Sequence, residues 1–255
     1  MKKLTSQIET IRKMALSLPP VGVLPGGAIR NHLHYIHLAR CRLVRTLLPP
    51  AATICDLGGA NSPLHLMGYR HPFERMVMVD LPAQERHEIY GRFEPRSYEG
   101  PGMVEVLYAN MVHLDALSSN AFDLVWSGQS IEHVDEEDGR QMCAEAFRIL
   151  KPGGAFCLDT PNGLVSSVHA ATSGLTLIHP EHKIEYEPAH LQNLLQEAGF
   201  LITDRRGICR MSQTAGSGAF SYEDFRDGEP ISDDVEDCYI QFYACQKPAL
   251  NGQTL

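Results

Sequence analysis

The chain has 255 residues, of which 44% are hydrophobic and 21% are charged, and its formal net charge at pH 7 is −9. This length and composition predict one large folded domain and exclude a chain that is disordered over most of its length. The acidic balance argues against nucleic acid or an anionic membrane as a partner, because both carry negative charge. No apolar run approaches the ~18 residues of a membrane-spanning helix, so no membrane span is expected.

The first 50 residues are expected to be helical. Apolar residues recur at helical spacing from Leu4 to Met14 and again from Leu33 to Leu47, and a pair of prolines follows each stretch. We expect residues 1–50 to form a helical cap or extension, and a homodimer would form through these helices. The start lacks the apolar core of a signal peptide, and the seven cysteines include no C-x-x-C, which together predict a cytoplasmic protein.

Strand-like and helix-like segments alternate from Thr53 onward. Helices are expected at Glu137–Leu150 and Pro188–Ala198, where apolar residues form a stripe. The expected strands are Thr53–Leu57, Met76–Asp80, Val104–Ala109, Phe122–Ser127, Ala155–Thr160, Phe200–Arg206 and Tyr239–Gln246. The alternation predicts an α/β fold with a doubly wound, mostly parallel seven-stranded sheet of the Rossmann-like type. The last two strands have only an irregular acidic segment between them, which predicts an antiparallel hairpin at the sheet edge.

Two long segments show no clear periodicity, residues 162–187 and 211–237. We interpret them as insertions in a domain that spans residues 51–248. Loops of this length in a compact domain are usually functional or disordered. Because both follow a strand, both are expected to overhang the carboxyl edge of the sheet, where ligands bind in this architecture.

The stretch TICDLGGANSP, from Thr53 to Pro63, is the most informative motif of the chain. Its short apolar strand ends at an acid, Asp56, and turns through two glycines. The next apolar strand ends at Asp80, 24 positions after Asp56. In an open α/β sheet this pattern supplies a tight turn and a carboxylate that accepts hydrogen bonds from the ribose hydroxyls of a nucleoside.

The glycine turn does not fit a dinucleotide. The fingerprint G-x-G-x-x-G, started at Gly58, has Ala60 and Pro63 at its second and third glycine places. A pyrophosphate needs backbone N–H groups at close range, and a proline removes one of them. The turn is better suited to a nucleoside without phosphate, such as S-adenosylmethionine, with Asp56 near its ammonium group and Asp80 at its ribose.

With these residues the chain resembles the class I S-adenosylmethionine-dependent methyltransferases, in particular their small-molecule, type 11-like group. DLGGANS stands where that family has acid-x-Gly-x-Gly-x-Gly, with Ala60 and Ser62 at the later glycine places. Further landmarks follow in order: Asp80, Asn110, FDLVWS with SIEHV behind it, and ILKPGG. The resemblance is strong over residues 50–160 and continues weakly through EYEPAHLQNLLQEAGF. It implies S-adenosyl-L-methionine as the donor and S-adenosyl-L-homocysteine as the product.

The resemblance also implies site residues. It places Asn110 and Met111 at the adenine, and Ser127 and Gln129 at the methionine side. The residues expected to bind the cofactor are Asp56, Gly58, Gly59, Ala60, Asp80, Leu81, Asn110, Met111, Ser127 and Gln129. For Asn110 the alternative is a residue that only shapes a turn.

His133 in SIEHV is the candidate catalytic residue. It follows the fourth strand and would reach the gap between donor and acceptor, and an imidazole titrates near neutral pH. We predict that it takes the proton of an acceptor hydroxyl; the alternative is that it shapes the pocket through a hydrogen bond. His179 and His182 in HPEHK, with Glu181, are candidates to bind the acceptor, to bind a metal or to act as a base; the alternative is a solvated polar loop.

No metal site is expected. Some quinone-type O-methyltransferases carry E-x-x-E-H at this place and bind a divalent metal, but here Gln129 stands at the first position, before Glu132 and His133. A neutral amide oxygen is a much weaker metal ligand than a carboxylate.

The sequence thus predicts a methyltransferase that acts on a small molecule, first of all by O-methylation of a sugar or glycan precursor or a secondary metabolite. N-methylation is an alternative, although the N-P-P-Y-type signature is absent after the fourth strand, where WSGQ stands. A binding or scaffold protein that keeps the fold without turnover stays open because the glycine turn is altered. Pro63 and ILKPGG argue against an NAD(P)-dependent enzyme.

Overall fold

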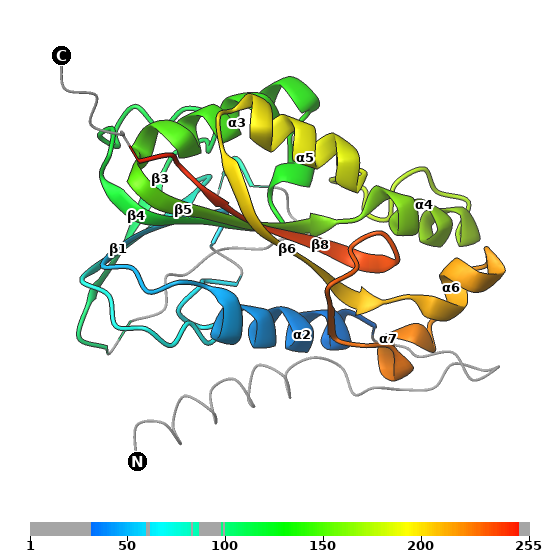
Figure 1. The fold of residues 1–255 in the computed structure, drawn as a ribbon. Helices are drawn as coiled ribbons and strands as arrows, with labels where there is room; N and C mark the ends of the chain where they lie inside the picture. Colours follow the sequence, from blue (N-terminus) through cyan, green and yellow to red (C-terminus); the bar gives the residue numbers. More distant parts are fainter. Residues whose placement is uncertain (1–31, 60–61, 83, 87–97, 99, 250–255) are drawn as a thin grey trace, which may run out of the picture.

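The computed structural model describes residues 32–59, 62–82, 84–86, 98 and 100–249. Within them, an eight-stranded sheet lies between helices (Figure 1). Its strands are β1 (Thr53–Leu57), β2 (Arg75–Asp80), β3 (Met103–Tyr108), β4 (Phe122–Gly128), β5 (Leu150–Pro161), β6 (Leu201–Arg210), β7 (Ile231–Ser232) and β8 (Cys238–Gln246). The helices are α2 (His32–Leu47), the short 3-10 helix η2 (Ile131–His133), α3 (Glu136–Ile149), α4 (Gly163–Thr172), α5 (Pro188–Glu197), α6 (Ser212–Ser217) and α7 (Asp224–Asp227).

The strand order is β3-β2-β1-β4-β5-β8-β6-β7. β1 pairs in parallel with β2 and β4, β2 with β3, and β4 with β5. β8 runs antiparallel to both of its neighbours, β5 and β6. The expected doubly wound, mostly parallel, Rossmann-like sheet with antiparallel pairing towards one edge is therefore confirmed. The structure adds an eighth strand to the seven expected, because the two residues of β7 pair with β6.

Side chains of the central strands are buried on both faces of the sheet. Successive residues of a strand point to opposite faces, and in β1 Cys55 and Leu57 pack with α3 and α5, whereas Ile54 packs with α2. Figure 1 shows α3 and α5 above the sheet and α2 below it. The second of the two predicted N-terminal helices is thus a layer of the core, and the first, at residues 4–14, lies outside the described residues.

The ends of α3 follow from local chemistry. The Asp135 side chain accepts a hydrogen bond from the Asp138 backbone N–H at 3.0 Å, and acidic residues fill the first turn, where the helix dipole favours negative charge. Leu150, the last residue of the expected helix, instead begins β5. The glycines of ILKPGG lie within this strand, and Gly153 has a φ of +82°.

The two segments without periodicity contain regular structure. Residues 162–187 hold α4, which begins after Asn162, whose Oδ1 accepts from the Leu164 N–H at 3.0 Å. Residues 211–237 hold α6, α7 and β7. The buried Asp224 carboxylate joins α7 to α6 by accepting from the Thr214 N–H at 2.9 Å. These elements are held by such contacts, and α6, α7 and β7, of six, four and two residues, are too short to show a period.

In the part of the chain that the structure describes, no helix combines the length and the apolar character that crossing a membrane requires.

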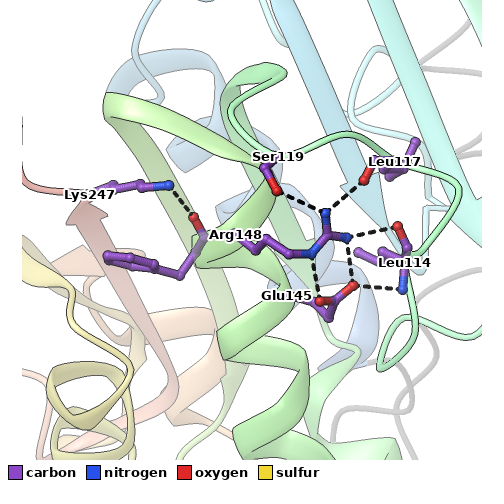
Figure 2. A network of polar contacts seen from close by, with 7 residues as sticks. Leu114, Leu117, Ser119, Glu145, Arg148 and Lys247 are labelled. Atoms are coloured by element: carbon purple, nitrogen blue, oxygen red, sulfur yellow. Dashed lines mark hydrogen bonds and ion pairs between the residues drawn. The ribbon is translucent and has the colours of Figure 1, made fainter.

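A polar network joins α3 to the connection between β3 and β4 (Figure 2). The Arg148 guanidinium donates to the Leu117 carbonyl at 2.8 Å and to the Leu114 carbonyl at 2.9 Å. Its Nε also donates to Glu145 Oε1 at 2.8 Å, and Glu145 Oε2 accepts from the Leu114 N–H at 2.8 Å. The donors of the planar guanidinium point in several directions, and together they bind the β3–β4 connection to α3.

Arg148→Lys should therefore destabilise the fold. Lysine keeps the charge but cannot donate in all of these directions, and each hydrogen bond of a charged group contributes about 1.5–3 kcal/mol when well shielded. Because the Arg148 side chain is 32% exposed, we expect the free energy of unfolding to fall by only about 1–2 kcal/mol. Urea unfolding followed by the fluorescence of Trp126, the single tryptophan, measures this change.

Arg226→Lys is the matched control. Arg226 pairs with Glu223 and Asp227 on the surface of one short helix, so its replacement should leave the unfolding midpoint unchanged. Equal midpoints for both variants would contradict the role given to Arg148.

Candidate functional site

The segments that follow β1, β2, β3 and β4 border a cavity of about 270 Å³, near the lower end of the range for small-molecule sites. Its lining consists of Gly58, Val79, Asp80, Leu81, Glu85, Arg86, Ala109, Asn110, Met111, Gln129, Ser130, His133, Val134 and Glu181. The structure thus brings together seven of the residues chosen from the sequence, which are Gly58, Asp80, Leu81, Asn110, Met111, Gln129 and His133.

Gly58 forms the turn at the end of β1. Its φ of +73° lies in the left-handed region, and its N–H donates to the Val79 carbonyl at 2.8 Å. A Cβ at this position would lie 2.2 Å from Ser130 Oγ, which donates to the Leu57 carbonyl at 3.1 Å. Glycine is required here both by the backbone angle and by the space.

Asp56 lies beneath this turn rather than in the pocket lining. Its carboxylate accepts from the Leu64 N–H at 2.8 Å, and a Cβ on Gly59 would lie 2.5 Å from it. Burial raises the pKa of Asp56 to about 7, and the hydrogen bond from Leu64 opposes this shift. In the structure Asp56 holds the turn, and its contact with the ammonium group of a ligand stays a prediction. Ala60 lies outside the described residues.

Asp80 ends β2 and lines the pocket. Its Oδ1 accepts from the Leu81 N–H at 2.8 Å and lies 3.5 Å from Arg86 Nε. The two side chains are only 12% and 6% exposed. The positive charge of Arg86 therefore offsets part of the cost of burying this carboxylate.

Asn110 shapes the turn after β3. Its Oδ1 accepts from the Val112 N–H at 3.1 Å, and its backbone carbonyl accepts from the His113 N–H at 2.9 Å. This agrees with the turn-forming alternative for Asn110. An amide oxygen has two lone pairs, so the same atom can accept a further hydrogen bond from a ligand in the pocket.

Gln129 has a strained backbone at the end of β4, with a φ of +55°. It is held by Asp159, whose carbonyl accepts from the Gln129 N–H at 2.8 Å and whose Oδ1 accepts from Nε2 at 3.0 Å. Asp159 Oδ2 accepts from Arg40 Nε of α2 at 2.7 Å. Strained residues cluster at functional sites, and here α2 supports one through a buried ion pair. Ser127, expected nearby, is buried in β4 outside the lining.

A histidine cluster lies at the His133 end of the pocket. The ring centroid of His133 lies 4.9 Å from that of His182 and 6.1 Å from that of His179. The Glu132 carbonyl fixes this segment by accepting from the Lys183 N–H at 2.8 Å. The HPEHK segment therefore packs against η2, although neither His179 nor His182 lines the pocket.

Burial sets the charges of this cluster. It raises the pKa of Glu132 to about 7, against the opposing effect of His182. It lowers the pKa of His133 to about 4, and repulsion from His182 adds to this. His133 Nδ1 lies 3.2 Å from the Glu181 carbonyl oxygen, which only a protonated nitrogen can approach favourably. The imidazole is therefore neutral at physiological pH, with its lone pair on Nε2.

Some of the lining residues were not chosen from the sequence. They are Val79, Glu85, Arg86, Ala109, Ser130, Val134 and Glu181. Five of them, including Glu181 beside His182, flank a chosen residue, so widening each motif by one position would have found them. Glu85 and Arg86 follow no pattern, and Glu181 belongs to HPEHK, which only the folded chain brings to the pocket.

Residues 56–158 match a family model described as a methyltransferase domain. A curated protein from Mycolicibacterium smegmatis, named a probable S-adenosylmethionine-dependent methyltransferase, is 35% identical over 105 residues. That match covers 41% of this chain, and the chain spans 38% of the length of that relative.

Solved structures share the fold at low identity. A SAM-dependent methyltransferase from Thermotoga maritima is 17% identical with a TM-score of 0.58, over 85% of this chain and 90% of that chain. One from Archaeoglobus fulgidus is 15% identical with a TM-score of 0.55, over 83% and 94%. The [4+2]-cyclase SpnF is 18% identical with a TM-score of 0.50, over 84% and 82%. At such identities the likeness establishes the fold alone.

Gly58→Ala should lower the melting temperature more than Gly153→Ala. Both glycines have a positive φ, so alanine costs about 1 kcal/mol of backbone energy at either place. Only at Gly58 does the new Cβ collide, since nothing lies within 4 Å of a Cβ at Gly153. Thermal unfolding followed by circular dichroism compares the two variants.

A double variant tests the cause. Ser130→Ala removes the Oγ that the new Cβ would meet, so it should restore part of the stability lost in Gly58→Ala. Equal melting temperatures for the two glycine variants would show that the contact with Ser130 does not matter.

Proposed function

The chain belongs, through residues 56–158, to the class I S-adenosylmethionine-dependent methyltransferases, and we propose that it transfers a methyl group to a small-molecule acceptor. The observation that carries this proposal is the convergence of Gly58, Asp80 and Asn110, from three neighbouring strand ends, on one cavity. The comparisons support the family; the donor site, the acceptor and the catalytic residue are proposals built on this cavity.

The residues of the pocket fit S-adenosylmethionine. A carboxylate is an acceptor only, and a ribose diol supplies two donors, so Asp80 suits the ribose. The Asn110 amide oxygen suits the adenine amino group, as the sequence predicts. Gly58 has no Cβ, so the turn can pass close to Ser130 without a collision and keep its shape at the pocket. We propose that these three residues hold the donor, with Leu81 and Met111 beside them.

When bound, the donor supplies a methyl carbon activated by a sulfonium. The protein then has to hold the acceptor in line with that carbon, exclude water and handle one proton. For a hydroxyl acceptor, the C–O bond would form as the C–S bond breaks, and the hydroxyl proton would pass to a neighbouring base or to water. Among the described lining residues, His133 is the histidine, and it can therefore contact the hydroxyl whose proton leaves.

We propose that the acceptor hydroxyl contacts Nε2 of His133. A general base works best when its pKa lies near the working pH, and the pKa of His133 is lowered to about 4. His133 is therefore better suited to accept a hydrogen bond from the hydroxyl than to hold its proton. The low pKa therefore favours a hydrogen-bonding role for His133 over the predicted role as a base. A further group that makes the acceptor hydroxyl more acidic would then assist the reaction.

The proposed acceptor is a sugar or glycan precursor or a secondary metabolite, with N-methylation as the alternative. The cavity of about 270 Å³ suits a small molecule, and the net charge of −9 disfavours nucleic acid. A neighbour named as a cyclase has a similar fold, so the fold alone does not decide between turnover and another use of the site. A cytoplasmic location and a homodimer through the N-terminal helices stay predictions of the sequence.

Asp80→Asn should weaken the binding of S-adenosylhomocysteine by about 10- to 100-fold. The substitution keeps the shape of the side chain but replaces one acceptor oxygen by a donor, and a hydrogen bond to a charged group contributes about 1.5–3 kcal/mol. Isothermal titration calorimetry measures the dissociation constant. Asp115→Asn, an exposed position outside the pocket, is the control that should bind as the wild type does.

An unchanged affinity in Asp80→Asn would remove the ribose role of this residue. If neither S-adenosylmethionine nor S-adenosylhomocysteine binds the wild-type protein, the methyltransferase proposal is wrong and the scaffold alternative gains support.

His133→Ala should lower kcat by at least about tenfold, because general acid–base and hydrogen-bonding groups at the reacting atom contribute about 10²- to 10⁴-fold. Its affinity for S-adenosylhomocysteine should stay within about twofold, since we place the donor on other residues. An acceptor for the assay comes from a screen of methyl-labelled donor against sugar nucleotides, phenols and amines. Equal turnover in the variant and the wild type would exclude His133 from catalysis.

A further inference from the structure

We propose that Glu132, His133 and His182 form a binding site for one divalent transition-metal ion of the zinc type at the His133 end of the pocket. One potential ligand atom of each side chain lies within 4.8 Å of the ligand atoms of the other two. Glu132 and His133 both belong to η2, and His182 comes from the segment between α4 and α5.

The chemistry of the side chains indicates the class of ion. Two imidazole nitrogens and one carboxylate oxygen suit Zn²⁺ and related first-row ions, whereas Mg²⁺ and Ca²⁺ prefer oxygen ligands throughout. With bonds of about 2.0–2.1 Å, the ligand atoms of a tetrahedral site lie about 3.4 Å apart. Small rotations of the two rings would therefore bring the three atoms to the distances of a metal site.

Both rings are already oriented by their second nitrogen. His133 Nδ1 lies 3.2 Å from the Glu181 carbonyl oxygen, and His182 Nδ1 lies 2.7 Å from Glu185 Oε1. Glu185 Oε1 also accepts from the Ile178 N–H at 2.9 Å. Metal-bound histidines almost always donate their other N–H to a carbonyl or a carboxylate in this way, which leaves the lone pair on Nε2.

Glu132 supplies an independent observation that points to a cation. Its side chain is 0% exposed, and Oε2 accepts from Thr160 Oγ1 at 2.8 Å. Its Oε1 is buried and has no hydrogen-bond donor among the residues that the structure describes. A buried carboxylate oxygen without a donor is costly, and an adjacent cation would remove that cost.

From the sequence alone we expect no metal site, because Gln129 stands where the E-x-x-E-H pattern has its first glutamate. In the structure the Gln129 amide is bonded to Asp159 and is not part of the cluster. The third ligand is His182, which lies far along the chain from His133. The Glu132 carbonyl holds the segment that carries His182 in place by accepting from the Lys183 N–H.

His133 belongs both to the cluster and to the pocket lining. An ion at the cluster would take up the lone pair of His133 Nε2, so the acceptor hydroxyl would contact the ion in place of Nε2, and a Lewis acid there makes a hydroxyl more acidic. This catalytic role rests on the proposed function. The binding site itself does not, because Asp80 and Asn110, which we propose to hold the donor, are not among its ligands.

Metal titration of the full-length protein tests the proposal. After treatment with EDTA and dialysis, we expect the protein to bind one Zn²⁺ per chain in isothermal titration calorimetry. His182→Ala should weaken this binding by more than about 100-fold, because even the loss of an outer partner costs about 10- to 100-fold. Glu185→Gln, which alters such an outer partner, should cost about 10- to 100-fold.

His190→Ala is the matched control. His190 also has a carboxylate partner, with Nε2 3.2 Å from Glu136 Oε1, but it is exposed and outside the cluster. This variant should bind Zn²⁺ as the wild type does. Equal losses in His190→Ala and His182→Ala would overturn the proposal, because the bound zinc would then be non-specific.

Absence of Zn²⁺ binding to the wild type, or wild-type affinity in His182→Ala, would also overturn it. Should His182→Ala fail to fold by circular dichroism, Co²⁺ added to the wild type decides. Co²⁺ in the proposed tetrahedral site absorbs visible light far more strongly than octahedral aqueous Co²⁺, and a spectrum like that of aqueous Co²⁺ would contradict the site. S-adenosylhomocysteine titrated in parallel reports on the donor site, so failure of the metal site and failure of the proposed function are distinguishable.

Discussion

The parallel pairing of β1 with β2 and β4 is the constraint on which the pocket depends. Leu57, at the end of β1, aligns with Val79 and with Ser127. The three strands therefore end at the same edge of the sheet, and the segments that follow them open onto one cavity. The pairing is stable because the central strands are apolar on both faces, one against α3 and α5 and the other against α2.

Buried carboxylates fix the irregular segments around this edge. Asp56 holds the turn after β1, Asp159 holds the strained Gln129, and Glu132 belongs to the group with His133 and His182. Each of these groups has lost its water, and such a group is tolerated only with donors or a cation beside it. Asp56 and Asp159 have their donors. Glu132 Oε1 has none among the described residues, and this difference makes its surroundings a candidate cation site.

Fold and function rest on different evidence in this protein. Proteins named as methyltransferases and one named as a cyclase share the fold, so the functional proposal rests on the matched residues 56–158 and on the groups in the cavity. In the proposal, Asp80 and Asn110, which the resemblance identifies, hold the donor. His133 and its neighbours are proposed to contact the acceptor.

The sequence by itself determined the type and order of most elements and much of the pocket lining. Strand and helix periods are local, and a turn such as the one at Gly58 depends on adjacent residues. The tertiary structure alone decided that His182 meets His133, that Arg40 reaches Asp159, and that the Asp56 carboxylate faces its own turn. Contacts between distant segments depend on packing and on side-chain direction, and neither leaves a periodic trace in the order of residues.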